Sequence, residues 1–359
     1  MSTIKVDTIT NGGSTVDFTY NAKVGAGSGA LKKEYYEQST EPTYPCDGAL
    51  WFNTSDDVFK IYVNNGWYTT AVEQPPSNSF GTRGVFAGGL GSPTNVIDYV
   101  TIASPGNATD FGDLTVARGY NSGCSNGTRG ITGPGSPSGG GTANNTLDYI
   151  TIATPGNATD FGDSFTTGYG QAGLGNSVRG VFGGGWVSSY NDISYITIAT
   201  TGNATEFGEL VTPQPEMGAT ANSTRGLFAG GWSGTSNVIQ YITIMSPGNS
   251  TDFGDLTVAR YSVAGAASET RALFAGGNTS GNVIDYVTIA TPGNATDFGD
   301  MTVTKSYRAA ASSGTRAIFG GGSSNTNVID YVTIATPGNA TDFGDLTESR
   351  QGAAGFAGS

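Results

Sequence analysis

The chain contains no histidine among its 359 residues. Histidine is the commonest general base and the commonest metal ligand, and it activates the nucleophile in Ser-His and Cys-His arrangements. Conventional triad chemistry is therefore excluded. We expect a protein that binds rather than catalyses, and one that needs no cofactor.

Basic residues are few, with 16 Lys and Arg against 29 Asp and Glu, which gives a formal net charge of -13. Such a field repels phosphate backbones and anionic headgroups, so we expect neither nucleic-acid binding nor membrane insertion. No apolar run approaches the ~20 residues of a spanning helix. Residues 1–7 have no apolar signal-peptide region, so the product is expected to stay soluble inside the producing cell.

Cysteine is also scarce, since the chain has only Cys46 and Cys124. The two fall in different segments and follow no zinc or redox spacing. Two unrelated free thiols are the favoured interpretation, and a disulfide is the alternative.

Glycine is abundant, with 57 residues, and much of it belongs to an internal repeat. Aligning the chain on itself brings six arginines into register at intervals of 46, 50, 46, 46 and 45 residues: Arg83, Arg129, Arg179, Arg225, Arg271 and Arg316. A period in the forties is typical of a four-stranded propeller blade.

The fifth copy shows the strands most clearly. Residues 261–268 form a small-residue strand, residues 271–277 an aliphatic strand ended by glycines, and residues 283–289 a strand rich in β-branched residues. A turn with Pro and Gly leads to a short last strand at 297–301. No blade can bury both faces alone, so blades must stack, and a ring does this. The sequence predicts an all-β protein with a six-bladed β-propeller over residues 79–359.

This pattern resembles the kelch repeat. The double glycine of kelch is matched by Gly88-Gly89, Gly184-Gly185, Gly230-Gly231, Gly276-Gly277 and Gly321-Gly322, and its tyrosine by Tyr99, Tyr149, Tyr195, Tyr241, Tyr286 and Tyr331. Two departures are Gly133-Pro134-Gly135 in the second copy, and phenylalanine where kelch usually has tryptophan: Phe111, Phe161, Phe207, Phe253, Phe298 and Phe343. The resemblance implies the fold and carries no particular function.

The two ends of the array predict how the ring closes. The first copy begins at its second strand, just after residues 74–78. Residues 350–357 match the small-residue first strand and have no blade of their own. We therefore expect the C-terminus to complete the first blade.

Residues 1–78 contain no copy of the repeat. Residues 1–34 are expected to be an anchor and linker, with linker composition at 21–30, and residues 35–78 a small module with a three-stranded β-meander at 49–53, 58–63 and 66–68. So small a module is not stable alone. It should pack on the propeller, on further copies of itself in a homo-oligomer, or on a partner.

The N-terminal residues carry a second resemblance. Residues 47–53 through Trp67 are similar to a small module of bacteriophage tail-fibre and other virion proteins, and residues 2–9 look like the start of structural proteins of marine phages. The resemblance implies a virion protein, assembled in the host cytoplasm and attached to other virion proteins through its N-terminal segment. The alternative is a bacterial surface or cytoplasmic propeller.

Polar residues that recur in every copy are interpreted as structural. The arginines should tie strands or blades together, and the asparagines of the repeated Asn-x-Thr sequence should form turns. Six carboxylate pairs are interpreted as turn formers and solubilising charges, with catalysis or Ca²⁺ binding as the alternatives: Asp110/Asp113, Asp160/Asp163, Glu206/Glu209, Asp252/Asp255, Asp297/Asp300 and Asp342/Asp345. An active site would break the repeat symmetry, and these pairs do not. No metal site is predicted.

Two groups of loops differ between copies, and in a kelch-type blade both should lie on one face. The loops after the double glycine hold Trp186, Tyr190 and Trp232, and include a longer segment at 136–145. The connections to the next blade hold Tyr120, Tyr169, Met217, Tyr261, Tyr307 and Arg308. Exposed aromatics suit stacking on sugars or gripping a protein surface, and filling gaps between blades is the alternative.

Together these features predict a phage virion component, either a tail fibre or a tail-attached protein. Its propeller would recognise a host-surface glycan or protein through one face. The alternative is a purely structural decoration or adaptor protein with no host ligand.

Overall fold

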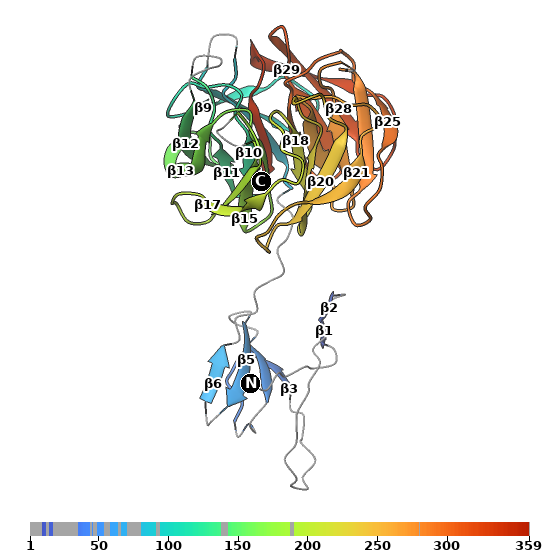
Figure 1. Ribbon diagram of the computed structural model, residues 1–359. Coiled ribbons are helices and arrows are strands. Elements are labelled where there is room, and N and C mark those ends of the chain that lie inside the picture. The colour runs from blue at the N-terminus through green and yellow to red at the C-terminus, as the bar shows by residue number, and fades with distance from the viewer. Residues whose placement is uncertain are drawn as a thin grey trace. The chain divides into compact units, whose positions relative to one another are not determined.

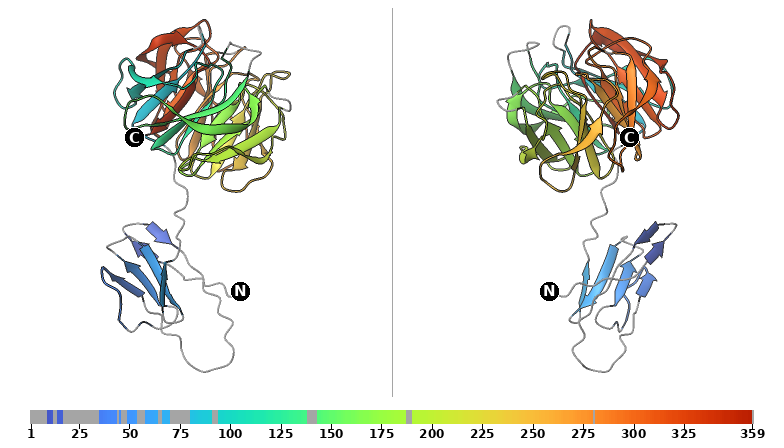
Figure 2. Two further views of the ribbon diagram at one scale, coloured as in Figure 1. Left: turned by 90° about the vertical axis from the view of Figure 1, so that its left-hand side faces the viewer. Right: turned by 45° about the vertical axis from the view of Figure 1, so that its right-hand side comes forward.

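The computed structural model describes residues 9–11, 14–16, 35–43, 45, 49–53, 58–63, 66–69, 80–90, 94–137, 143–186, 190–279 and 281–358. These residues form strands, turns and loops, with no helix that could cross a membrane. The chain divides into two compact units, Met1–Gln74 and Pro75–Ser359. The second unit is the predicted six-bladed β-propeller, whose ring of blades is visible in Figures 1 and 2.

Each blade is a four-stranded antiparallel sheet that runs from an inner strand to an outer strand. In this order, the first blade consists of β30 (Ala354–Gly358), β7 (Arg83–Ala87), β8 (Val96–Thr101) and β9 (Thr109–Asp113). The second consists of β10 (Gly123–Ser125), β11 (Arg129–Thr132), β12 (Asn144–Thr151) and β13 (Thr159–Gly168). The third consists of β14 (Ala172–Gly175), β15 (Arg179–Gly183), β16 (Asp192–Thr197) and β17 (Thr205–Glu209).

The other three blades repeat this order. The fourth consists of β18 (Gly218–Ala221), β19 (Arg225–Ala229), β20 (Val238–Thr243) and β21 (Thr251–Asp255). The fifth consists of β22 (Ala264–Ala267), β23 (Arg271–Ala275), β24 (Val283–Thr288) and β25 (Thr296–Asp300). The sixth consists of β26 (Ala309–Ser312), β27 (Arg316–Gly320), β28 (Thr326–Thr333) and β29 (Thr341–Arg350).

The ring closes as the sequence predicted. The C-terminal strand β30 pairs antiparallel with β7, from Ala354 opposite Ala87 to Gly358 opposite Arg83. The same strand packs against β26 and β10, the inner strands of the two neighbouring blades. The first blade is therefore assembled from both ends of the repeat array.

The ring has two faces with different contents. One face, called the repeat face below, carries the turns between first and second strands and the Pro-Gly-Asn turns between third and fourth strands. The opposite face, called the variable face, carries the loops after the double glycine and the connections from each outer strand to the next blade. Backbone hydrogen bonds join the loops after the double glycine to the connections, as in Gly89 N–H to Arg118 O (2.9 Å) and Gly231 N–H to Arg260 O (3.0 Å).

The repeated arginine, tyrosine and phenylalanine form one stack in each blade. In the first blade the Arg83 guanidinium lies 4.4 Å from the Tyr99 ring centroid, and Tyr99 meets the buried Phe111 edge to face at 5.8 Å. Arg83 Nη1 then donates to Ile152 O in the next blade at 2.6 Å. The same arginine-to-carbonyl bond recurs around the ring. The predicted structural role of these arginines is confirmed.

The repeated asparagines also connect neighbours. Asn157 Oδ1 in the second blade accepts a hydrogen bond from Asp113 N–H in the first at 3.1 Å, and Asn107 of the first blade does the same for Asp345 of the last. These asparagines are turn residues, as predicted, and they also join one blade to the next.

Four blades contain a buried ion pair that the repeat pattern did not reveal. The pairs are Arg118–Asp148 (2.9 Å), Arg260–Asp285 (3.0 Å), Arg308–Asp330 (2.7 Å) and Arg350–Asp98. Burial lowers the pKa of all four arginines, against the opposing effect of the aspartates. The third and fourth blades have Ser194 and Gln240 in place of the aspartate.

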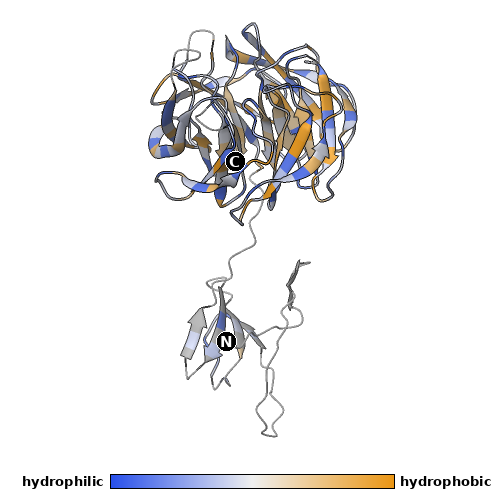
Figure 3. Ribbon diagram, viewed as in Figure 1, coloured by the Kyte–Doolittle hydropathy of each residue, from blue (hydrophilic) through white to orange (hydrophobic). Residues whose placement is uncertain are grey.

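Hydrophobic clusters fill the spaces between adjacent blades, with Phe86, Val100 and Ile318 together in the cluster that joins the last blade to the first. Figure 3 shows hydrophobic residues concentrated along the strands of the propeller. The core is thus distributed around the ring, and every blade depends on both neighbours.

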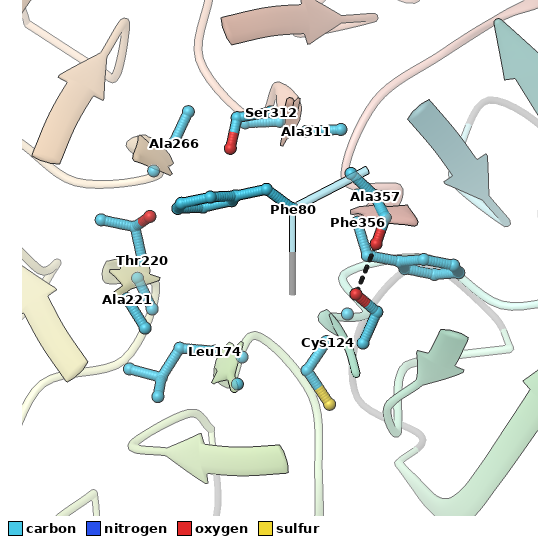
Figure 4. A pocket seen from close by; sticks show the side chains of 18 residues that line it. Phe80, Cys124, Leu174, Thr220, Ala221, Ala266, Ala311, Ser312, Phe356 and Ala357 are labelled. Carbon is cyan, nitrogen blue, oxygen red and sulfur yellow. Dashed lines mark hydrogen bonds between the residues drawn. The ribbon is translucent and has the colours of Figure 1, made fainter. Parts of the chain in front are cut away.

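The inner strands surround a central channel lined mainly by glycine and alanine. Figure 4 shows Phe80 lying across this channel, among residues of the inner strands. Phe80 lies against Gly314 in the turn between β26 and β27, so the chain enters the propeller at the repeat face. Cys124 lines the channel as a buried free thiol, as predicted, and burial raises its pKa. Cys46 lies outside the described residues.

The first unit contains the predicted meander, β4 (Leu50–Asn53), β5 (Val58–Val63) and β6 (Gly66–Thr69). It also contains a hairpin of β1 (Ile9–Asn11) and β2 (Ser14–Val16), and β3 (Tyr35–Gln38), which pairs in parallel with β4. Trp51 Nε1 donates to Gln38 O at 2.9 Å, and its ring meets Trp67 at 5.4 Å. The predicted linker at 21–30 lies outside the described residues.

Candidate functional site

The variable-face end of the channel is bounded by one residue from each blade. Every one of the six has a left-handed backbone with φ between 53° and 66°: Tyr120, Gly170, Glu216, Ser262, Tyr307 and Gly352. Their main chains form a ring of hydrogen bonds, in which each N–H donates to the carbonyl of the preceding member, from Gly170 N–H to Tyr120 O (2.7 Å) round to Gly352 N–H to Tyr307 O (2.8 Å). Asn121 N–H closes the ring on Gly352 O at 3.4 Å. We call these six residues the mouth ring.

Four members of the mouth ring carry side chains although their left-handed backbone conformation is unfavourable for any residue but glycine. Glycine adopts φ > 0 freely, and Gly170 and Gly352 show that glycine satisfies this position. A side chain there costs roughly 1–2 kcal/mol. Strain of this kind tends to collect at functional sites. Tyr120, Glu216, Ser262 and Tyr307 are therefore candidates for a functional role.

Glu216 is the hub of the site. Its Oε1 accepts a hydrogen bond from Trp186 Nε1 at 3.0 Å. Its Oε2 accepts from Ser262 Oγ at 2.7 Å and from Tyr307 OH at 2.9 Å. One carboxylate thus connects the third, fifth and sixth blades across the mouth of the channel.

Two of the donors to this carboxylate, Trp186 and Tyr307, belong to an unbroken series of aromatic rings. Tyr307 meets Tyr120 at 5.2 Å between ring centroids, Tyr120 meets Tyr169 at 6.0 Å, and Tyr169 stacks on Trp186 at 6.4 Å. Trp186 in turn meets Trp232 at 4.9 Å and Tyr190 at 5.6 Å. We call these six residues the aromatic series. Its outer members Tyr190 and Trp232 are exposed, whereas the other four are half-buried.

The electrostatics of the mouth favour neutral tyrosines beside Glu216. Burial, followed by the negative charge of Glu216, raises the pKa of Tyr307 and that of Tyr120. Both hydroxyls therefore keep their protons at neutral pH, and Tyr307 remains a hydrogen-bond donor to Glu216.

The variable face also carries the exposed hydrophobic surface. In the described part of the chain, all the large hydrophobic residues that are strongly exposed belong to this face: Val116, Phe165, Tyr190, Val211, Trp232 and Val258. Concentration on one face is typical of an interaction surface.

The structure brings together six of the eight site residues proposed from sequence, namely the members of the aromatic series. Tyr261 precedes Ser262 in the fifth blade, where its hydroxyl accepts a hydrogen bond from Asn278 Nδ2, and it joins no ring contact among the described residues. Met217 is buried in the core between the third and fourth blades. Of the longer second-copy loop, residues 138–142 lie outside the described residues.

Arg308, the eighth residue proposed from sequence, lies in an ion pair rather than in the aromatic series. It lines the pocket at the mouth, but its guanidinium is buried and donates to Asp330 Oδ2 (2.7 Å) and Phe319 O (2.8 Å). It takes the part that Arg118, Arg260 and Arg350 play in other blades, although it comes from a position three residues later in the repeat, where the usual arginine position holds Lys305. We assign Arg308 to the framework of the ring.

Glu216 was missed from sequence. It follows Gln214-Pro215 in a connection with no aromatic residue, whereas the site was predicted from tyrosine and tryptophan. Its position in the repeat could have identified it. The strand register makes Leu174, Thr220 and Ala311 equivalent. The residues four positions before them are Gly170, Glu216 and Tyr307, so Glu216 is equivalent to Tyr307.

The repeated carboxylate pairs lie on the outer strands, with Asp110 exposed and Asp113 half-buried. No group of three or more Cys, Asp and Glu side chains placed to hold a metal ion is found in the described part of the chain.

The chain was compared with known proteins. No protein-family model matches it, and no curated protein sequence does.

Proposed function

We propose that this protein is a bacteriophage virion component, a tail fibre or tail-attached protein, whose kelch-like propeller binds a host-surface glycan or protein through the variable face. The observation that carries the proposal is the departure from sixfold symmetry. The repeated arginine, tyrosine, phenylalanine and asparagine are the same in every blade, whereas the mouth ring and the aromatic series differ between blades. A ligand without sixfold symmetry requires such differences.

The path of the chain supports this choice of face. Phe80 enters at the repeat face, and β30 ends there with Gly358 opposite Arg83. Both described ends of the propeller therefore lie at the face opposite to the variable face. The uniform repeat face offers no comparable aromatic cluster in the described residues.

The aromatic series predicts the first test. Replacing both Trp186 and Trp232 by Ala should abolish adsorption of the virion to its host, because anchor aromatics carry ~2 kcal/mol or more each. Trp232 is 46% exposed, so its loss should hardly change the melting temperature. Loss of the Trp186 bond to Glu216 should cost about 1 kcal/mol. Adsorption assays and thermal melts of the purified protein measure the two effects.

Asp110 provides the control, since it is exposed on β9, outside the variable-face loops. Asp110→Ala should leave adsorption unchanged. Unfolding of the double variant would identify the tryptophans as packing residues. Normal adsorption of a folded double variant would contradict the proposal and favour a structural decoration or adaptor protein.

The N-terminal segment predicts a separate experiment. Removing residues 1–34 should leave the melting temperature of the propeller unchanged, because the described strands of the ring all lie between Arg83 and Gly358. The truncated chain should fail to enter virions. Immunoblots of purified particles measure incorporation, and particles that contain the truncated chain would refute the anchoring role.

A further inference from the structure

A pocket opens inside the mouth ring, at the variable-face end of the channel. Its lining includes the mouth-ring side chains of Tyr120, Glu216, Ser262 and Tyr307. Around them lie Asn121, Gln171, Met217, Val263 and Arg308. Its walls thus combine aromatic rings with one carboxylate.

The charge of that carboxylate is uncompensated. In the described part of the chain the ion pairs involve only Asp98, Asp148, Asp285 and Asp330, and none includes Glu216. Arg308 is the one cation in the lining, and Asp330 neutralises it at 2.7 Å. The net charge of the pocket is therefore negative, within a protein whose overall charge is -13.

We propose that this pocket binds a primary ammonium group, the free 2-amino group of an amino sugar in the host-surface glycan. Glu216 would be the counter-ion, and Tyr120 and Tyr307 would supply cation–π attraction. The Glu216 carboxylate is a hydrogen-bond acceptor, which favours a group with N–H donors over a quaternary ammonium. The inference rests on the proposed function and names the chemistry of its ligand.

An amino sugar fits better than a lysine side chain because the pocket adjoins the rest of the aromatic series. Trp186 contacts Glu216 directly and leads outward to Trp232 and Tyr190, which are exposed. Flat aromatic faces beside the ammonium site would receive the following sugar rings of the chain by stacking.

Calorimetric titration of the full-length protein with the tetrasaccharide of β-1,4-linked glucosamine tests the inference. We expect binding that weakens with added salt, accompanied by a change in tryptophan fluorescence. The fully N-acetylated tetrasaccharide, which lacks the charge, should bind at least tenfold more weakly. Glu216→Gln should reduce affinity for the glucosamine oligomer about ten- to a hundredfold, the range for loss of a charged hydrogen-bond partner.

Glu269→Gln is the matched control, because Glu269 is an exposed carboxylate that accepts a hydrogen bond from Ser223 Oγ on the repeat face. It should bind like the wild type. Unchanged affinity in a folded Glu216→Gln variant, equal binding of the acetylated oligomer, or no binding of the glucosamine oligomer would each overturn the inference. Binding of tetralysine in place of the oligosaccharide would identify a protein lysine as the ligand and overturn the sugar. Host adsorption of the Trp186/Trp232 variant is measured separately, so the proposed function can survive each of these results.

Discussion

Deletion of residues 350–359 is expected to abolish cooperative folding of the whole propeller. The deletion removes β30, which supplies the inner strand of the first blade and packs on β26 and β10. Strand β30 contains Phe356, which is buried at 5% exposure, and loss of such a side chain costs about 3–5 kcal/mol. The deletion also removes Arg350 and leaves Asp98 buried without its partner, which costs a further ~3–5 kcal/mol.

The sum is comparable to the entire stability of a typical domain, ~5–15 kcal/mol. Scanning calorimetry and circular dichroism of the full-length and truncated chains measure the effect. A chain ending at Gly358 is the control and should melt like the wild type. The single change Phe356→Ala should lower stability without abolishing folding. A truncated chain with an unchanged transition would show that the first blade does not need β30.

Features that repeat were predictable from sequence, because each copy confirms the others. Aligning one arginine from each copy sets the register of the whole array. That register predicts the six blades, the order of their strands and the equivalent positions of the arginines that bond to the next blade. Closure by β30 was predictable for the same reason, since a first copy without its inner strand and a terminal strand without a blade imply each other.

Features that depend on spatial closure were not predictable. Arg350 and Asp98 lie 252 residues apart in sequence and meet only because the ring closes. Arg308 reaches Asp330 from a position that differs from that of Arg260, so no fixed spacing identifies the pairs. In the first unit, β3 pairs in parallel with β4, and parallel strands are not joined by a hairpin turn that could be recognised in the sequence. Glu216 was overlooked because its importance comes from three blades meeting at one point.

The buried ion pairs lead to a second large expected effect. Asp285→Ala should destabilise the propeller by about 3–5 kcal/mol. Asp285 is fully buried and accepts hydrogen bonds from Arg260 Nη2 (3.0 Å), Thr257 Oγ1 (2.6 Å) and Thr257 N–H (3.1 Å). Its removal leaves the Arg260 guanidinium buried without a counter-charge, and Thr257 belongs to the preceding blade, so a contact between blades is lost as well.

The fourth blade supplies the control for this prediction. At the equivalent positions it has Gln214 and Gln240, and Gln240 bonds to Thr212 O (2.9 Å) and Ser250 Oγ (2.7 Å) without any charge. The double change Arg260→Gln with Asp285→Gln should therefore cost less than Asp285→Ala alone, although it alters two buried residues. Urea unfolding of the single and double variants compares them directly. If the double variant were the less stable, the pair would contribute through its attraction. The opposite order, which we expect, would show that the main cost lies in leaving one charge buried alone, and that the ring can dispense with the pair wherever both members change together.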